Sequence, residues 1–109
     1  MKINVLGAEY TVEVKQRTDE KLLADCDGYC DKTTRRIVVA AEDDESELGD
    51  YEQYKKKCVR HEIVHAFLFE SGLHEDFEHV NNGHEETMVD WIAVQFPKMQ
   101  KAFIEADAL

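Results

Sequence analysis

Residues 60–69 read RHEIVHAFLF and combine two histidines and a glutamate with a strongly apolar background. His61 and His65 are four residues apart, so a helix places both on one face, about one turn apart. Apart from His65, every residue from Ile63 to Phe69 is apolar, which predicts a buried helix. Burying two imidazoles and the carboxylate of Glu62 without partners is costly. We therefore expect a partner that satisfies them.

The spacing matches the HExxH pattern, in which two imidazoles bind one metal ion and a glutamate acts as general base. His61 and His65 can direct their ring nitrogens at one ion. Glu62 lies about 100° further round the helix and can reach a water bound to that ion. The competing interpretation is a helix with two surface histidines and an ordinary glutamate, because short patterns occur by chance. The apolar flanks argue against that interpretation.

A catalytic zinc site keeps three protein ligands and one open position for water. The longer pattern HExxHxxGxxH needs a glycine and a histidine where this chain has Leu68 and Ser71, so that class is excluded. The alternative is a glutamate from a later helix, and Glu86 fits. Asp90 lies four residues after Glu86 and shares a helix face with it. Asp90 can accept a hydrogen bond from a ligand histidine, through the ring N–H on the side that does not bind the metal, and His61 is the first candidate.

Other residues compete with Glu86 for the third ligand position. The first alternative is the adjacent Glu85. The remaining candidates are three histidines, each expected to be a loop residue: His74, His79 and His84. One of these histidines can instead stabilise an oxyanion, a role that the sequence does not assign to any of them.

Length and composition predict a single domain over residues 1–109. A chain of 109 residues, 43% hydrophobic, has room for one core. The net charge of −11 disfavours nucleic-acid and anionic-membrane partners, which need a basic face. This charge is interpreted mainly as keeping the protein soluble, with attraction of a basic peptide as the weaker alternative. Because no apolar run reaches membrane-spanning length and no signal-peptide core is present, we expect a cytoplasmic protein.

The cysteines do not predict a disulfide framework, because the chain has three of them. Cys26 and Cys30 flank a turn-like segment, but a separate structural zinc site needs four soft ligands and is disfavoured. Cys58 falls one turn before His61 and is expected to be a small buried residue near the site.

Hydrophobic patterning predicts an α+β fold, with an antiparallel or mixed sheet of about three strands before two helices. Residues 2–15 alternate with period two around Gly7-Ala8, which predicts a hairpin or a bent strand. Residues 35–41 predict a β-branched strand. Residues 25–31 are rich in turn-forming types, and residues 21–24 fit either strand or helix.

The helix that carries the two histidines is expected to begin at Asp50, which is a suitable N-cap, and to stop at Gly72. A second helix follows from about His84. Pro97 either breaks or kinks this helix, or begins a last one.

His61-Glu62-Ile63-Val64-His65, followed 21 residues on by Glu86-x-x-x-Asp90, resembles the gluzincin metallopeptidases, where HExxH pairs with ExxxD on a second helix. The stretch HEIVHAFLFESGL and the small size are more similar to compact metallopeptidase-like proteins of phages and prophages. The stretch EETMVDWIA is similar to the glutamate helix of the ImmA/IrrE group. These motifs cover residues 58–93. The alanine–asparagine pair usual on that helix is Val89-Asp90 here, and no extra domain is present to form a deep cleft.

The resemblance implies a small zincin-like domain in which His61, His65 and Glu86 bind zinc and Glu62 is the catalytic base. It also implies an edge strand, here residues 36–40, that holds the backbone of a peptide or protein substrate by strand addition. The implied function is a zinc peptidase in the cytoplasm, that of the host if the protein is phage-encoded. The alternative is a non-catalytic, metal-stabilised binding or regulatory module of phage origin. Glu62 favours the enzyme, because a purely structural zinc needs no base.

Overall fold

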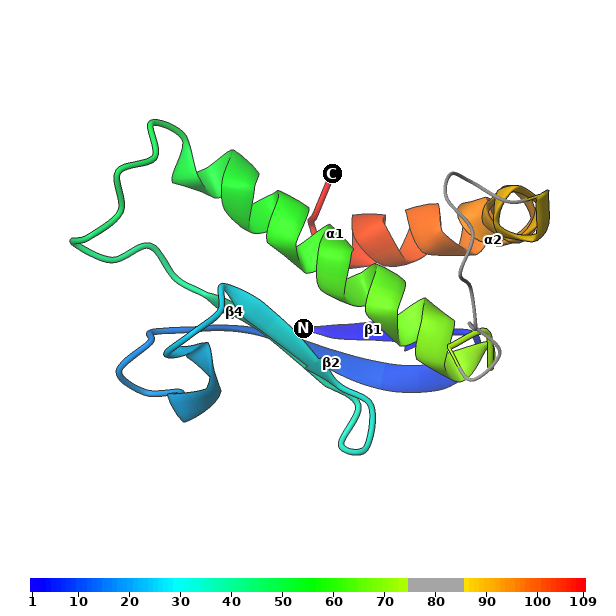
Figure 1. The fold of residues 1–109 in the computed structure, drawn as a ribbon, viewed down its shortest axis with the longest axis horizontal. Coiled ribbons are helices and arrows are strands. Elements are labelled where there is room, and N and C mark those ends of the chain that lie inside the picture. Colours follow the sequence, from blue (N-terminus) through cyan, green and yellow to red (C-terminus); the bar gives the residue numbers. More distant parts are fainter. Residues whose placement is uncertain (75–85) are drawn as a thin grey trace.

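The computed structural model describes residues 1–74 and 86–109, with the side chains at positions 86, 89, 90 and 93 outside that description. The described residues form a four-stranded mixed sheet and two long helices, an α+β arrangement. The helices lie on one face of the sheet, and a short 3-10 helix, Lys21–Leu23, lies on the other (Figure 1).

The first two strands form the predicted hairpin. β1 (Lys2–Val5) pairs antiparallel with β2 (Ala8–Lys15). Leu6 and Gly7 join them with φ values of 52° and 93°. Two successive positive φ values are typical of the tight hairpin turns whose twist matches that of the strands.

The sheet differs from the prediction in having four strands rather than about three. The additional strand is β3 (Gly28–Asp31), in a segment that turn-forming residues had marked as a turn. β3 pairs antiparallel with β4 (Arg36–Ala40), and β4 pairs parallel with β2, so the strand order is β1-β2-β4-β3. Backbone pairing of four residues with the apolar strand β4 stabilises the extended conformation more than Asp27 and Gly28 favour a turn.

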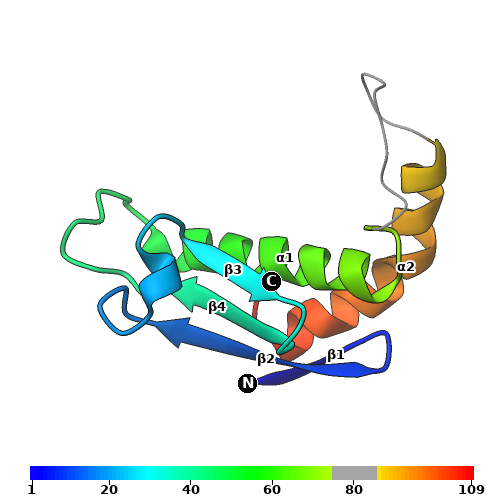
Figure 2. The same ribbon diagram turned by 60° about the horizontal axis from the view of Figure 1, so that its bottom comes forward.

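The prediction that residues 36–40 form an edge strand is wrong. Figure 2 shows β3 at the edge of the sheet, with β4 between β3 and β2. Ile37, Val38, Val39 and Ala40 are all buried. A continuous apolar run of this kind belongs to a strand that is covered on both faces.

The first long helix, α1 (Tyr51–Glu70), begins and ends as predicted. The Asp50 side chain accepts a hydrogen bond from the backbone N–H of Gln53 at 3.2 Å, which is an N-cap. Gly72 follows the helix with a φ of 79°, a conformation that glycine adopts at low cost. The buried residues Ile63, Ala66 and Phe67 attach α1 to the sheet.

The second long helix, α2 (Glu86–Glu105), continues through Pro97 instead of ending there. Figures 1 and 2 both show its axis changing direction partway along, so the prediction of a kink holds and that of a separate last helix is wrong. The predicted start at His84 lies outside the described residues. Beyond the proline, Met99, Ala102 and Phe103 are buried and join the core.

Candidate metal centre

Two imidazoles meet on α1. The Nε2 atoms of His61 and His65 are 3.2 Å apart, and the ring centroids are 4.9 Å apart. Two nitrogens held at about 2.0–2.1 Å from one tetrahedral zinc lie about 3.3 Å from each other. The observed separation therefore matches a pair of ligands to one ion, although one neutral ring can also donate an N–H hydrogen bond to the other at this distance.

Glu62 is buried beside these rings, with only 5% of its surface exposed. One of its carboxylate oxygens, Oε2, has no hydrogen-bond partner among the described residues. Burial raises the pKa of the Glu62 carboxyl above its ordinary value, and the nearby His65 and His61 partly oppose that rise. An unpartnered buried carboxylate is costly, so a group that satisfies Oε2 fits this position.

The three side chains form one cluster. In the part of the chain that the structure describes, they are the only group of three or more candidate ligands, with their ligand atoms within 4.8 Å of one another. The two imidazole nitrogens have the separation expected of zinc ligands, and the Glu62 carboxylate lies beside them. The burial of this stretch differs from residue to residue: His61 is exposed while Glu62 is not. The cluster is therefore open to solvent on the histidine side.

The backbone of β3 packs against the carboxylate. A Cβ atom added at Gly28 would lie 3.4 Å from Cγ of Glu62 and 3.2 Å from the carbonyl oxygen of Val38. A glycine at this position thus allows close contact between the edge strand and α1. This contact is part of what buries Glu62.

A cavity of about 170 Å³ opens next to Glu62 and His61. Its other lining residues come from β3, the segment before it and the first half of α1: Asp27, Gly28, Tyr54, Lys57 and Cys58. The cavity places a small volume of solvent-accessible space against the base candidate and one imidazole. Glu62 can therefore act on a molecule bound there.

The predicted third ligand and its partner are not described at the level of side chains. Glu86 is the first residue of α2 and Asp90 lies within the same helix, but their side chains lie outside the described residues. Glu85, His84 and His79 also lie outside them. The structure does place α2 in contact with α1, and Glu86 as a ligand stays a prediction.

His74, the remaining alternative ligand, is described and lies apart from the cluster. Its ring is exposed and packs edge-on against Phe69, with centroids 4.7 Å apart. His74 is therefore an aromatic packing partner at the end of α1 in this structure.

Two thiols lie near the site. Cys58 is buried, as predicted, and lines the small cavity. Burial raises the pKa of Cys58, and it raises the pKa of Cys30 to about 12, with the charge of Glu62 as the next cause. Both thiols are therefore protonated at neutral pH in the metal-free protein, which makes them poor nucleophiles. Sequence reasoning did not place Cys30 here, because its segment was interpreted as a turn.

Sequence reasoning also missed a polar pair at the other end of the cavity. The Tyr54 hydroxyl donates a hydrogen bond to Asp27, which also forms an ion pair with Arg17. One indication of this pair was present in the sequence: Tyr54 lies four residues before Cys58 and so shares a helix face with it. Asp27 comes from a segment with no periodic pattern, and only the tertiary structure brings it to α1.

Comparison of the chain with protein-family models, with curated proteins and with solved structures found no match. Among residues 1–74 and 86–109, neither long helix has the length and apolarity needed to cross a membrane. The functional argument therefore depends on the residues and geometry of the site.

Proposed function

We propose that this protein is a zinc-dependent peptidase with a gluzincin-type, zincin-like site. The observation that supports this most directly is a buried carboxylate with an unpartnered oxygen beside two imidazole nitrogens 3.2 Å apart. A structural site with two histidines requires no buried carboxylate there. A base next to a metal-bound water does require one.

His61, His65 and Glu86 would hold the zinc, which supplies, when bound, a Lewis acid and a water of lowered pKa. Asp90 would accept the outer N–H of His61 and so keep Nε2 of that ring free to bind. Glu62 does not bind the metal in this proposal.

Glu62 would take a proton from the attacking water at its carboxylate and deliver it to the amine that leaves. Both steps are favoured when the pKa of the carboxyl lies closer to neutrality than usual. The direction in which burial moves the pKa of Glu62 agrees with this role. The edge contact with Gly28 holds the carboxylate in place against β3.

The substrate would be a peptide or a protein segment in extended conformation. β3 is an edge strand, paired on one side only among the described residues, and it lies against Glu62. An extended substrate that adds to the free edge of β3 would bring its backbone to the site. In this proposal β3 takes the role that the sequence had suggested for residues 36–40. A cytoplasmic location and a phage origin stay predictions.

The test uses purified protein, a mixed peptide library, and mass spectrometry of the products with and without a chelator. Cleavage that the chelator stops, that zinc restores, and that is lost in Glu62→Gln supports the peptidase. Glu52→Gln is a matched control, because Glu52 is exposed on the same helix and pairs with Lys55. Zinc bound to the wild-type protein with no cleavage of any peptide would favour the metal-stabilised binding module instead.

A further inference from the structure

A second, larger cavity adjoins the candidate metal centre. It has a volume of about 460 Å³, within the range of about 300–1,000 Å³ that is usual for ligand sites. Asp27 and Tyr54 line both this cavity and the small one that contains Glu62. The hydrogen-bonded Asp27–Tyr54 pair is thus a common wall between them. Only the side chains of Asp27 and Tyr54 would separate a ligand in the larger cavity from the small cavity that contains Glu62.

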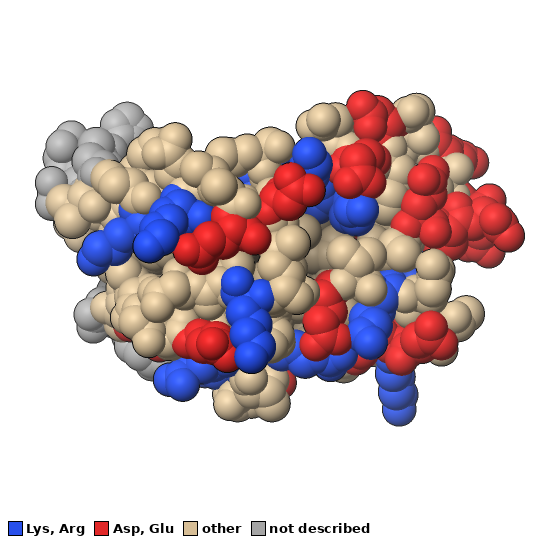
Figure 3. Space-filling view, turned by 180° about the vertical axis from the view of Figure 1, so that it is seen from behind, with Lys and Arg blue, Asp and Glu red and all other residues tan. Residues whose placement is uncertain are grey.

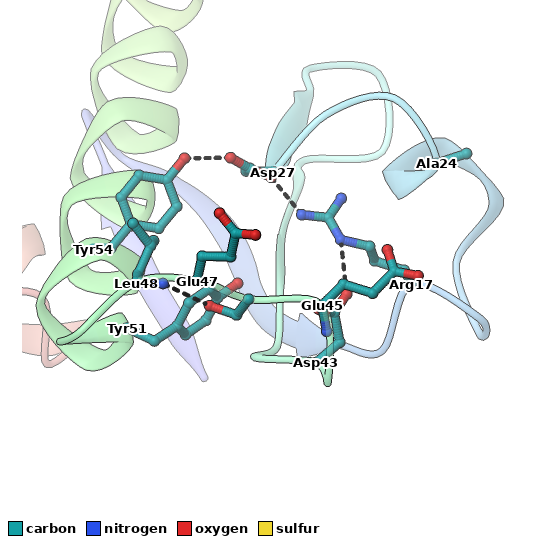
Figure 4. Close-up of a pocket in the computed structure, with 10 residues that line it drawn as sticks. Arg17, Ala24, Asp27, Asp43, Glu45, Glu47, Leu48, Tyr51 and Tyr54 are labelled. Atoms are coloured by element: carbon teal, nitrogen blue, oxygen red, sulfur yellow. Dashed lines mark hydrogen bonds and ion pairs between the residues drawn. The ribbon is translucent and has the colours of Figure 1, made fainter.

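The larger cavity is built from segments that are far apart in the sequence and are held together by specific contacts. Arg17 donates hydrogen bonds to the carbonyl oxygens of Leu23 and Cys26 and forms ion pairs with Asp27 and Asp43. Figure 4 shows Asp27 between the Tyr54 hydroxyl and this guanidinium and joined to both, so that Tyr54 and Arg17 lie on opposite sides of the cavity.

Tyr51, which lines the cavity from α1, is also held in place by a hydrogen bond. The Tyr51 hydroxyl donates a buried hydrogen bond of 2.7 Å to the carbonyl oxygen of Ala40, at the end of β4. Tyr51 and Tyr54 lie in the first turn of α1 and offer two aromatic rings to the cavity. Aromatic faces attract cations, ammonium and guanidinium groups among them.

The charge of the lining is strongly negative. Four carboxylates line the cavity, those of Asp27, Asp43, Glu45 and Glu47, against the single cation of Arg17, so the lining carries a net charge of −3. Arg17 pairs with the first two. The side chains of Glu45 and Glu47 have no hydrogen bond or ion pair with any described residue, and Figure 4 shows the Glu47 carboxylate pointing into the space between Tyr54 and Arg17.

The lining is less acidic on the other side of the common wall. The small cavity has one cation, Lys57, against the two carboxylates of Asp27 and Glu62, a formal charge of −1 compared with −3 for the larger cavity. The Lys57 ammonium lies 5.8 Å from the centre of the Tyr54 ring. Acidic residues gather at the end of the molecule formed by residues 42–47, as Figure 3 shows from behind. A cation that approaches the site is therefore attracted more strongly to the larger cavity than to the smaller one.

We propose that the larger cavity binds a lysine or arginine side chain of the substrate, so that the enzyme acts on basic peptide segments. This inference rests on the proposed peptidase function and names its substrate class. Glu62, with its unpartnered Oε2, lines the adjoining small cavity, so a side chain held in the larger cavity would place the neighbouring substrate backbone close to it. Glu45 and Glu47 would pair with the cationic head, and the two tyrosines would pack against the aliphatic stem.

The test measures binding and does not need hydrolysis. Zinc-loaded Glu62→Gln protein is titrated into four labelled peptides that differ at one central residue, which is Arg, Lys, norleucine or Glu, and fluorescence anisotropy is recorded. We expect the Arg and Lys peptides to bind at least about fivefold more tightly than the norleucine peptide, and the Glu peptide to bind most weakly. Equal affinity for all four peptides would overturn the proposal.

A pair of double variants locates the effect. Glu45→Gln with Glu47→Gln, in the Glu62→Gln background, should reduce the preference for Arg over norleucine to less than about twofold. Glu42→Gln with Asp44→Asn removes the same two charges from the same loop but at positions that do not line the cavity. This control should keep the preference. An equal loss in both double variants would overturn the proposal in favour of general attraction to an acidic surface.

Two further outcomes separate this proposal from the peptidase itself. Selective binding of basic peptides without cleavage by the wild-type protein would keep the cavity's assignment and refute the peptidase. Cleavage of all four peptides at equal rates would support the peptidase and refute the assignment of the larger cavity to a basic side chain. Displacement of the Arg peptide by about 1 mM calcium chloride at matched ionic strength would assign the acidic lining to a metal ion and overturn the proposal.

Discussion

Gly28 on β3 and Glu62 on α1 lie against each other: a Cβ at position 28 would be 3.4 Å from Cγ of Glu62. The same Cβ would lie 3.2 Å from the carbonyl oxygen of Val38 and 3.3 Å from Cγ2 of Val39. The backbone at Gly28 is not in the positive-φ region, so the glycine is needed for space and not for conformation. The position of the base candidate therefore depends on the edge strand.

We expect Gly28→Ala to destabilise the protein by about 1 kcal/mol and Gly28→Val by more, because neighbouring atoms must move to admit the side chain. Urea denaturation measures this change. Gly49→Ala is the control: a Cβ there would meet nothing within 4 Å, so its effect should stay within about 0.5 kcal/mol. Equal stability of the Gly28 and Gly49 variants would show that β3 does not pack on Glu62 as described.

His65→Ala should weaken zinc binding by more than about 100-fold, since one of the three proposed protein ligands would be lost. His74→Ala should leave zinc affinity unchanged, because its ring lies against Phe69 and outside the cluster. Competition with a coloured chelator gives both affinities. Wild-type zinc affinity in His65→Ala would refute the ligand assignment, and weakened binding in His74→Ala would restore His74 as a candidate ligand.

Glu62→Gln should stabilise the metal-free protein by roughly 1–3 kcal/mol at pH 8, because it removes a buried carboxylate whose Oε2 has no partner. The same variant should keep zinc and lose hydrolysis. Thermal denaturation in the presence of chelator measures the first effect. A less stable metal-free Glu62→Gln protein would indicate that the wild-type carboxylate is satisfied within the fold.

The pKa of the Asp27 carboxyl is lowered, first by the hydrogen bond from Tyr54 and then by Arg17. Because the folded pKa lies below the unfolded one, the interaction stabilises the fold above the unfolded pKa of about 3.9, and this contribution is lost as the pH falls through the folded pKa. We expect Tyr54→Phe to raise the pKa of Asp27, measured by NMR of the carboxyl carbon.

Tyr51→Phe is the control for that titration, because the Tyr51 hydroxyl donates to the carbonyl oxygen of Ala40 instead. It should leave the Asp27 pKa close to that of the wild type. An Asp27 pKa that does not respond to Tyr54→Phe would mean that the common wall between the two cavities is not formed in solution.

Arg36 joins three strands on the sheet face opposite the long helices. Its guanidinium pairs with both carboxylate oxygens of Glu13 at 3.0 and 3.1 Å, and it also contacts Glu20 and the hydroxyl of Tyr29. Arg36→Met should therefore cost about 1–2 kcal/mol. Arg35→Met, which removes one exposed ion pair with Glu70, should cost less than about 0.5 kcal/mol. Urea denaturation compares them, and similar losses would contradict a special role for Arg36.

The predicted features that the structure confirms are local in sequence. The hairpin of residues 2–15 follows from alternation and a glycine turn, and α1 from the cap at Asp50 and the stop at Gly72. The pairing of His61 with His65 needs only helical geometry, because residues four apart share a face. These interactions span a few residues, so the order of amino acids alone specifies them.

Other features were decided only by the tertiary structure. The turn-like residues 28–31 form the edge strand β3 because they pair with the apolar strand β4. Packing of α1 against β3 at Gly28 helps to bury Glu62. The larger cavity joins Arg17, Asp27, Glu47 and Tyr54 from segments with no shared pattern. Such contacts depend on the packing of distant segments and on the loop closures that bring them together. The sequence by itself therefore determined the cluster on one helix, and the fold determined the environment in which that cluster acts.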